Sequence, residues 1–234
     1  MRHLAMRDLI HPSDTARRDI PAELALAIHE HRLAPGTRLG EDELAAIFGV
    51  SRTVVRAALQ QLAHEKLVTL VRNRGASVAQ PSVREAREVF EARALLEPRT
   101  ARSAAERATK SDIARLKAHG EAEHAALHAG DNGRALHLSG LFHIEIARIA
   151  DQDTILDFIT KLVARSSLVI ALYWQRRTAI CENHAHDALI RAFETKDADL
   201  AEELMKGHLL DLLTSLDLRN TPAPALSLRD ALNR

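Results

Sequence analysis

The sequence predicts a mainly α-helical protein, in which a small N-terminal unit with a short β-ribbon precedes a larger all-α unit. Two observations lead to this fold class. β-Branched residues gather in two short segments between residues 67 and 80, whereas every segment from Ser82 onward has helical periodicity or composition. The chain has 234 residues, of which 46% are hydrophobic and 27% charged, so it is long enough for two modest globular domains. These proportions exclude a disordered or fibrous protein.

The N-terminal unit begins with three predicted helices. One apolar stripe over residues 24–33 ends at Pro35-Gly36, and a second over residues 44–48 ends at Gly49. Ser51 is placed to cap the third helix, because its hydroxyl can accept a hydrogen bond from an amide of the first turn. The face of this helix that we expect to be buried consists of Val55, Ala58, Leu59 and Leu62.

A hairpin is predicted after the third helix. Its strands are Leu67–Val71 and Ala76–Gln80, and residues 72–75 join them. Asn73 and Gly75 suit the positive φ that such a loop requires. A short helix, a glycine turn, a second helix and a β-ribbon in this order have the arrangement of a winged helix-turn-helix.

A basic surface is predicted on this unit. Residues 51–75 carry five Lys or Arg side chains against Glu65 alone, whereas the whole chain has 32 basic and 32 acidic residues. The outward face of the third helix would offer Arg56 and Gln60 to base edges in a major groove, which predicts double-stranded DNA as a partner. The full predicted contact set is Ser51, Arg52, Thr53, Arg56, Gln60, Arg72, Arg74 and Gly75, with the arginines at 52, 72 and 74 on phosphates. The alternative is a solvated basic face on a domain that contacts only proteins.

A domain boundary is predicted at residues 80–82. Ser82 and Glu85 have the spacing of a capping box, which would start a new helix directly after the ribbon. Turn-forming residues then divide the rest of the chain into about six helices, as expected for a helical bundle. The predicted divisions are residues 1–80 for the winged helix-turn-helix, residues 82–218 for the all-α domain and residues 219–234 for a loose tail.

Three of the 13 histidines are candidates for a metal site in the second domain. His143, His186 and His208 fall on three different predicted helices, and imidazoles from facing helices of a bundle can converge on one ion. Composition and spacing do not select these three from the rest. Ordinary surface or core histidines are the alternative.

The N-terminal unit resembles the GntR-type bacterial transcription regulators. The resemblance covers about the first 80 residues and rests on an ordered series of short matches. These are Leu33–Leu39, Glu41–Ala45, Phe48–Thr53, Val55-Arg56, Ala58-Leu59, Leu67-Val68 and Asn73–Gly75. Departures are Val54 where the family usually has proline, Ala57 where it often has glutamate, and Lys66 where glycine is usual. The resemblance implies that operator DNA is bound by a homodimer.

The C-terminal unit resembles the FCD effector domain of the FadR subgroup of these regulators. The matching residues are Phe90–Pro98, Phe142-His143, His186 with Leu189, Ile190 and Ala192, and His208-Leu209. The resemblance implies a small carboxylate effector, with Arg93 near it and His143, His186 and His208 on a divalent metal. An ion pair with Glu97, one helical turn further along, is the alternative role of Arg93. Ser139 stands where the family's metal-binding aspartate is expected. Loss of that oxygen ligand disfavours Mg²⁺ and Ca²⁺ and leaves Zn²⁺ or Ni²⁺ as the favoured ions, with Ser139 as a weak ligand or effector contact. A pocket that binds its effector without a metal is the alternative.

Together these features predict an effector-responsive transcription regulator, such as a repressor, that is not an enzyme. The rival hypotheses are a metal-dependent enzyme on a His-rich helical bundle and an architectural DNA binder without an effector. A single cysteine, Cys181, and the lack of a long apolar run predict a cytoplasmic protein without a membrane anchor. Seven scattered aromatic residues argue against single-stranded nucleic acid as the target.

Overall fold

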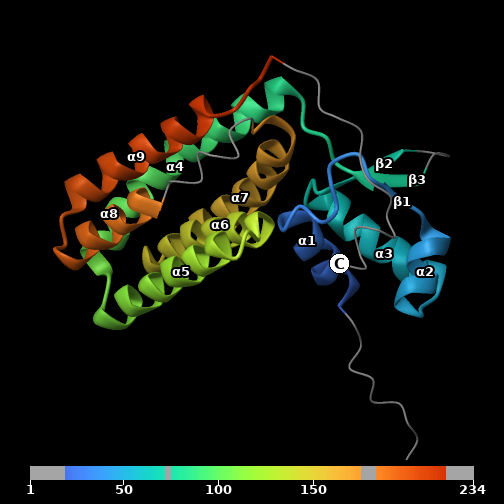
Figure 1. Cartoon of the computed structure of the whole chain (residues 1–234), viewed down its shortest axis with the longest axis horizontal. Coiled ribbons are helices and arrows are strands. Elements are labelled where there is room, and N and C mark those ends of the chain that lie inside the picture. Colours follow the sequence, from blue (N-terminus) through green and yellow to red (C-terminus); the bar gives the residue numbers. More distant parts are fainter. Residues whose placement is uncertain (1–18, 72–74, 175–182, 220–234) are drawn as a thin grey trace, which may run out of the picture.

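The computed structural model describes residues 19–71, 75–174 and 183–219, and it confirms the predicted fold class (Figure 1). Three helices and three short strands form the N-terminal unit. They are α1 (Ile20–His29), β1 (Arg38–Leu39), α2 (Glu41–Phe48), α3 (Arg52–His64), β2 (Val68–Val71) and β3 (Gly75–Val78). The sheet is antiparallel with the strand order β1-β3-β2. Strand β1 was not predicted, because two residues are too few to show an alternating pattern.

The local signals of the N-terminal unit act as the sequence predicts. The Ser51 hydroxyl caps α3 by accepting a hydrogen bond from the Val54 amide at 3.5 Å. Gly49 ends α2 with a φ of 66°, and Gly75 opens β3 with a φ of 85°, so both adopt the left-handed conformation that favours glycine. The predicted inner face of α3 is buried in the core of this unit. The outer face of α3 is therefore free to meet a partner.

Six helices form the C-terminal bundle in the described part of the chain. They are α4 (Val83–Arg107), α5 (Lys110–His128), α6 (Asn132–Ile149), α7 (Asp153–Tyr173), α8 (Asn183–Glu194) and α9 (Ala198–Thr214). Helix α4 starts at the expected capping box, in which Ser82 and Glu85 exchange hydrogen bonds. It lies along α9, while α5, α6 and α7 pack side by side on the other side of the bundle (Figure 1). The predicted division at residues 80–82 stays a prediction.

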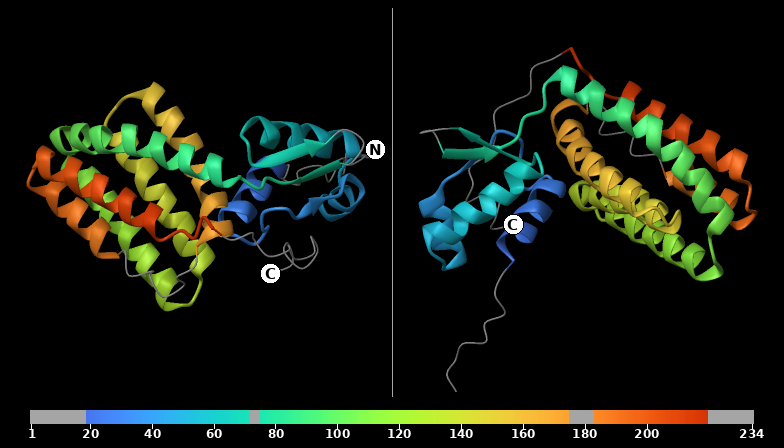
Figure 2. Two further views of the ribbon diagram at one scale, coloured as in Figure 1. Left: turned by 90° about the horizontal axis from the view of Figure 1, so that it is seen from above. Right: turned by 180° about the vertical axis from the view of Figure 1, so that it is seen from behind.

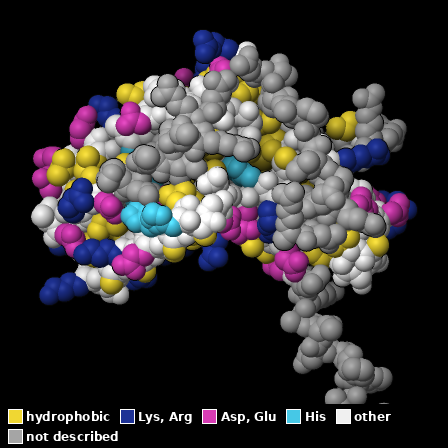
Figure 3. Space-filling view, in the orientation of Figure 1, with side chains coloured by type: hydrophobic (Ala, Val, Ile, Leu, Met, Phe, Trp, Pro, Cys, Tyr) yellow, Lys and Arg dark blue, Asp and Glu magenta, His cyan; other side chains and the backbone are white. Residues whose placement is uncertain are grey.

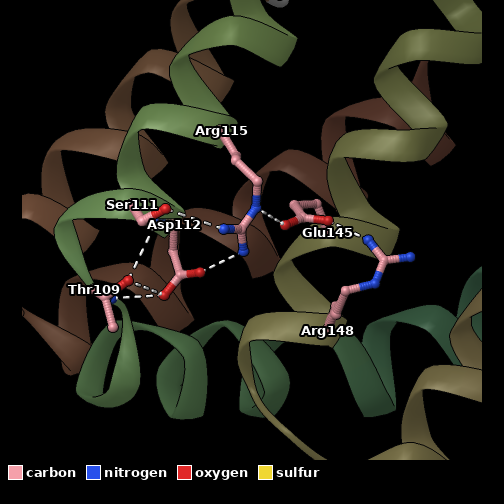
Figure 4. Close-up of polar contacts among 6 residues, drawn as sticks. All are labelled: Thr109, Ser111, Asp112, Arg115, Glu145 and Arg148. Atoms are coloured by element: carbon pink, nitrogen blue, oxygen red, sulfur yellow. Dashed lines mark hydrogen bonds and ion pairs between the residues drawn. The ribbon is translucent and has the colours of Figure 1, made fainter.

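A cluster of ion pairs fixes α5 against α6 (Figure 4). Glu145 of α6 is almost fully buried and accepts a hydrogen bond of 2.8 Å from Arg115 of α5, and it also pairs with Arg148. Burial raises the pKa of Glu145, but the two guanidinium groups outweigh burial and lower the pKa below its usual value. Arg115 additionally pairs with Asp112, which completes the capping box of α5 with Thr109. The pairing of these two helices sets the position of α6, which carries His143.

The N-terminal unit docks on the bundle through α1, which packs against α6 and α7 (Figure 2). Gly133 at the start of α6 lies so close to α1 that a Cβ there would stand 2.0 Å from the Glu30 carbonyl oxygen. Leu168 of α7 is buried in the core of the N-terminal unit rather than in that of the bundle. The two units are therefore closely packed at the C-terminal end of α1.

The exterior carries acidic and basic side chains in mixture on the face shown in Figure 3. None of the helices in the described residues has the length and apolar character needed to cross a membrane.

Candidate functional site

Three buried histidines from three helices of the bundle converge on one point. His143 of α6, His186 of α8 and His208 of α9 are each at most 3% exposed. One ring nitrogen from each lies within 4.8 Å of those of the other two, and the Nε2 atoms of His143 and His208 are 3.2 Å apart. Tetrahedral Zn²⁺ with Zn–N bonds of 2.0–2.1 Å places its nitrogen ligands about 3.3 Å apart, so this separation suits two ligands of one ion.

Buried carboxylates contact the Nδ1 atoms of two of these rings. Nδ1 of His143 lies 2.6 Å from Oε2 of Glu97, and Nδ1 of His186 lies 3.0 Å from Oε2 of Glu123. A carboxylate that accepts the Nδ1–H of a histidine fixes its tautomer and leaves Nε2 as an electron-pair donor, which is the usual support of a metal-binding histidine. Neither glutamate was among the predicted site residues.

The protonation and hydrogen bonding of the three rings leave ring nitrogens available to bind a cation. Nε2 of His186 is buried and has no hydrogen-bond partner among the described residues. Burial lowers the pKa of His143 despite the opposing Glu97, and burial followed by the neighbouring histidines lowers the pKa of His208 well below its usual value. Both rings are therefore neutral at pH 7 and available as ligands. The donor set thus fits a borderline divalent ion such as Zn²⁺ or Ni²⁺.

Arg93 of α4 connects this cluster to a cavity. It pairs with Glu97 at 2.5 Å, and its Nη1 donates a 3.0 Å hydrogen bond to the Ser166 hydroxyl. Burial raises the pKa of Glu97, but Arg93 and then His143 outweigh it and lower the pKa to about 2. The ion pair that was the alternative role for Arg93 is therefore present, yet Arg93 also lines the cavity.

The cavity has a volume of about 260 Å³ and reaches the metal-ligand candidates at His143. Ser139 lines it one helical turn before His143, so the residue in the place of the expected aspartate faces the same space. The walls are mainly apolar side chains of α6 and α7. Two further lining residues, His29 and His31, come from the end of α1 in the N-terminal unit, and sequence reasoning did not single them out.

The predicted DNA-contacting face of α3 is exposed. Its outward residues Thr53, Arg56, Ala57 and Gln60, together with Ser51 and Arg52, are all accessible to solvent. Arg56 forms two hydrogen bonds to the Glu41 carboxylate of α2, at 3.0 and 2.7 Å, and Arg52 pairs with Asp42 at 3.1 Å. Gly75 is exposed at the tip of the ribbon, whereas Arg72 and Arg74 lie outside the described residues.

Comparison with protein families gives two matches that together cover most of the chain. Residues 16–78 match the family described as bacterial regulatory proteins, gntR family, and residues 88–211 match the FCD domain. The chain is 28% identical to the Nta operon transcriptional regulator of Aminobacter aminovorans over 85% of this chain and 98% of that one. It is 27% identical to the HTH-type transcriptional repressor RspR of Escherichia coli over 88% and 91%. These relatives are transcriptional regulators, which are not enzymes.

Solved structures share the fold. The chain superposes on Escherichia coli McbR/YncC with a TM-score of 0.74 and 22% identity, over 83% of this chain and 93% of the other. A putative GntR regulator from Rhodococcus sp. RHA1 gives a TM-score of 0.75 at 22% identity, over 83% and 94%. At these identities the superpositions show a common fold.

Proposed function

Because the chain belongs to the GntR family of bacterial transcription regulators and carries an FCD effector-binding domain, we propose that it binds operator DNA as a homodimer whose affinity a small carboxylate changes. The observation that carries the effector site is the buried histidine cluster, in which carboxylates contact His143 and His186 and His143 also lines a cavity. The protein is proposed to act in the cytoplasm, where bacterial operator DNA is located.

His143, His186 and His208 are the proposed ligands of one divalent ion, with Zn²⁺ or Ni²⁺ favoured. Such an ion would supply a Lewis-acidic centre to which a carboxylate oxygen can bind. Glu97 and Glu123 orient the first two rings by accepting their Nδ1–H groups. Three imidazoles without an anionic protein ligand leave the ion's positive charge uncompensated, which favours an anionic effector.

Arg93 and Ser139 are the proposed effector contacts of this chain. Both line the cavity next to His143. The guanidinium of Arg93 is already shared between Glu97 and Ser166, so it is held in a fixed, preorganised position rather than as a free side chain. The Ser139 hydroxyl can donate a hydrogen bond to the carboxylate.

At the DNA, the exposed face of α3 is proposed to enter the major groove. Arg56 and Gln60 would contact base edges, while Ser51, Arg52 and Thr53 would contact the backbone. Arg72, Arg74 and Gly75 of the ribbon are proposed to contact the adjacent phosphates. A homodimer extends the short recognition helix to two half-sites, which predicts a pseudo-palindromic operator.

The test joins metal content and ligand binding. Protein purified without chelator is expected to contain about one Zn²⁺ or Ni²⁺ ion per chain by elemental analysis, and His208→Ala is expected to lose it. A panel of organic acids is then screened by melting temperature, because a ligand that binds only the native state raises it. Acids that stabilise the wild type but not His208→Ala support the site. A protein without metal after titration, or a DNA affinity that no stabilising acid changes, would refute the proposal.

A further inference from the structure

The cavity lies at the contact between the two units, and the DNA-binding unit forms one of its walls. His29 ends α1 and His31 follows it, and both line the cavity together with residues of α6 and α7. The ring of His29 stacks on that of His137 of α6 at 5.8 Å between centroids. A molecule inside the cavity is thus enclosed by both units.

His31 adopts a left-handed backbone conformation and reaches across to α7. Its φ is 56°, in the left-handed region where a helix usually ends in Gly or Asn. Its Nε2 lies 3.1 Å from the carbonyl oxygen of Ser167 of α7 and 3.2 Å from the hydroxyl of the same residue. A histidine that bears backbone strain and reaches across a domain contact into a cavity is a candidate for a ligand-binding role.

The contact with Ser167 determines which ring nitrogen of His31 carries the proton. A carbonyl oxygen can only accept, so Nε2 of His31 carries the proton and donates the hydrogen bond. Burial lowers the pKa of His31 to about 4, so at pH 7 the ring is neutral and its Nδ1 is an unprotonated acceptor. Burial and the neighbouring His137 likewise lower the pKa of His29 to about 4. The two rings therefore carry no charge at pH 7, and Nδ1 of His31 is able to accept a hydrogen bond.

The remaining walls limit the ligand further. No acidic side chain lines the cavity in the described part of the chain, so nothing there compensates a ligand cation. Most of the wall is apolar, and the 260 Å³ volume is below the ~300–1,000 Å³ of typical drug-sized sites. These walls therefore suit a small ligand with an apolar body and an uncharged donor group such as a hydroxyl.

We propose that His31, with His29 beside it, binds the donor end of a small hydroxylated monocarboxylate whose carboxylate lies at the His143 side, so that the DNA-binding unit contacts the effector directly. This inference rests on the proposed effector site and extends it to the N-terminal unit. A ligand held in this way favours the docked arrangement of the two units over any other.

The test uses two matched pairs of acids on the full-length, Zn²⁺-loaded protein. The pairs are 6-hydroxyhexanoate with hexanoate and 4-hydroxybenzoate with benzoate. The wild type is expected to bind the hydroxylated member of at least one pair about tenfold more tightly by calorimetry, because one hydrogen bond of about 1.4 kcal/mol changes Kd tenfold. In ¹⁵N-histidine spectra that acid is expected to shift the side-chain signals of His29 and His31.

His31→Gly is the decisive variant, because glycine suits a φ of 56° and the protein is expected to stay folded. It should bind both members of the pair equally. Asp151→Gly is the matched control, since Asp151 has a φ of 57° in the turn between α6 and α7 and does not line the cavity, and it should keep the preference.

The outcomes separate this inference from the proposed function. Equal binding of both members by the wild type, or a preference that survives in His31→Gly, overturns the role of His31. If the acids bind in a manner that His143→Ala abolishes, the carboxylate site stands in either case. If none of the four acids binds the wild type, the inference falls and the carboxylate site loses its support for acids of this size.

Discussion

Lowering the pH should decrease the free energy of unfolding through the histidines at the contact between the two units. His31 has a pKa of about 4 in the folded chain, lowered by burial, against an ordinary value of 6.5. The unfolded chain therefore takes up a proton near pH 6.5 that the native state does not bind until about pH 4. More protons on the unfolded state mean that the free energy of unfolding falls as the pH decreases between these two values.

The size of the effect follows from the two pKa values. At pH 7 the difference in proton binding hardly changes the free energy of unfolding. At pH 5 it lowers the free energy of unfolding by about 2 kcal/mol for this one residue. For a chain of this length that corresponds to a decrease of about 4–8 °C in melting temperature. His31→Asn removes the titration while keeping a residue that tolerates the left-handed conformation.

The assay is thermal melting at pH 7, 6 and 5 in the presence of EDTA, so that metal loss does not contribute. The wild type is expected to lose about 4–8 °C more than His31→Asn between pH 7 and pH 5. His64→Asn is the control, because His64 is exposed at the end of α3, and it should follow the wild type. Identical pH dependence of the wild type and His31→Asn would refute the reasoning.

Three further predictions follow from single contacts. Arg56→Ala should weaken binding to duplex DNA by about tenfold or more, whereas Glu41→Gln should strengthen it by releasing Arg56, and a gel shift in which Glu41→Gln binds no more tightly would contradict this. Gly133→Ala should lower the melting temperature by several degrees because its Cβ meets a carbonyl oxygen of α1 at 2.0 Å, while Gly207→Ala, which has open space, should not. Ser139→Asp should slow the loss of Zn²⁺ to a chelator, and an unchanged rate would show that position 139 does not reach the ion.

The features that the sequence predicts well are those set by neighbouring residues. Ser51 and Ser82 cap the helices that follow them, and Gly49 and Gly75 adopt positive φ, because each signal acts within one turn of chain. The buried and exposed faces of α3 follow from helical periodicity alone. The convergence of His143, His186 and His208 is different, since spacing did not select them and only the family resemblance did.

The features that the sequence did not predict come from contacts between distant residues. Glu97 and Glu123 support histidines that are 46 and 63 positions away, and glutamates at helical spacing otherwise look like surface residues. His29 and His31 line the cavity only because α1 packs against α6 and α7. The same docking depends on Gly133, whose role is to let the Glu30 carbonyl group approach.

The arrangement at Ser166 and Ser167 shows how a ligand signal could reach the DNA without a long pathway. Ser166 accepts a hydrogen bond from Arg93, which connects through Glu97 to His143, while the next residue, Ser167, contacts His31 of the DNA-binding unit. Coupling between two sites is typically about 1–3 kcal/mol, which is comparable to one or two hydrogen bonds. A ligand that strengthens or breaks the His31–Ser167 contact therefore supplies enough energy to shift the DNA-binding unit. In the proposed mechanism, direct contact across one cavity therefore couples the effector to the DNA-binding unit.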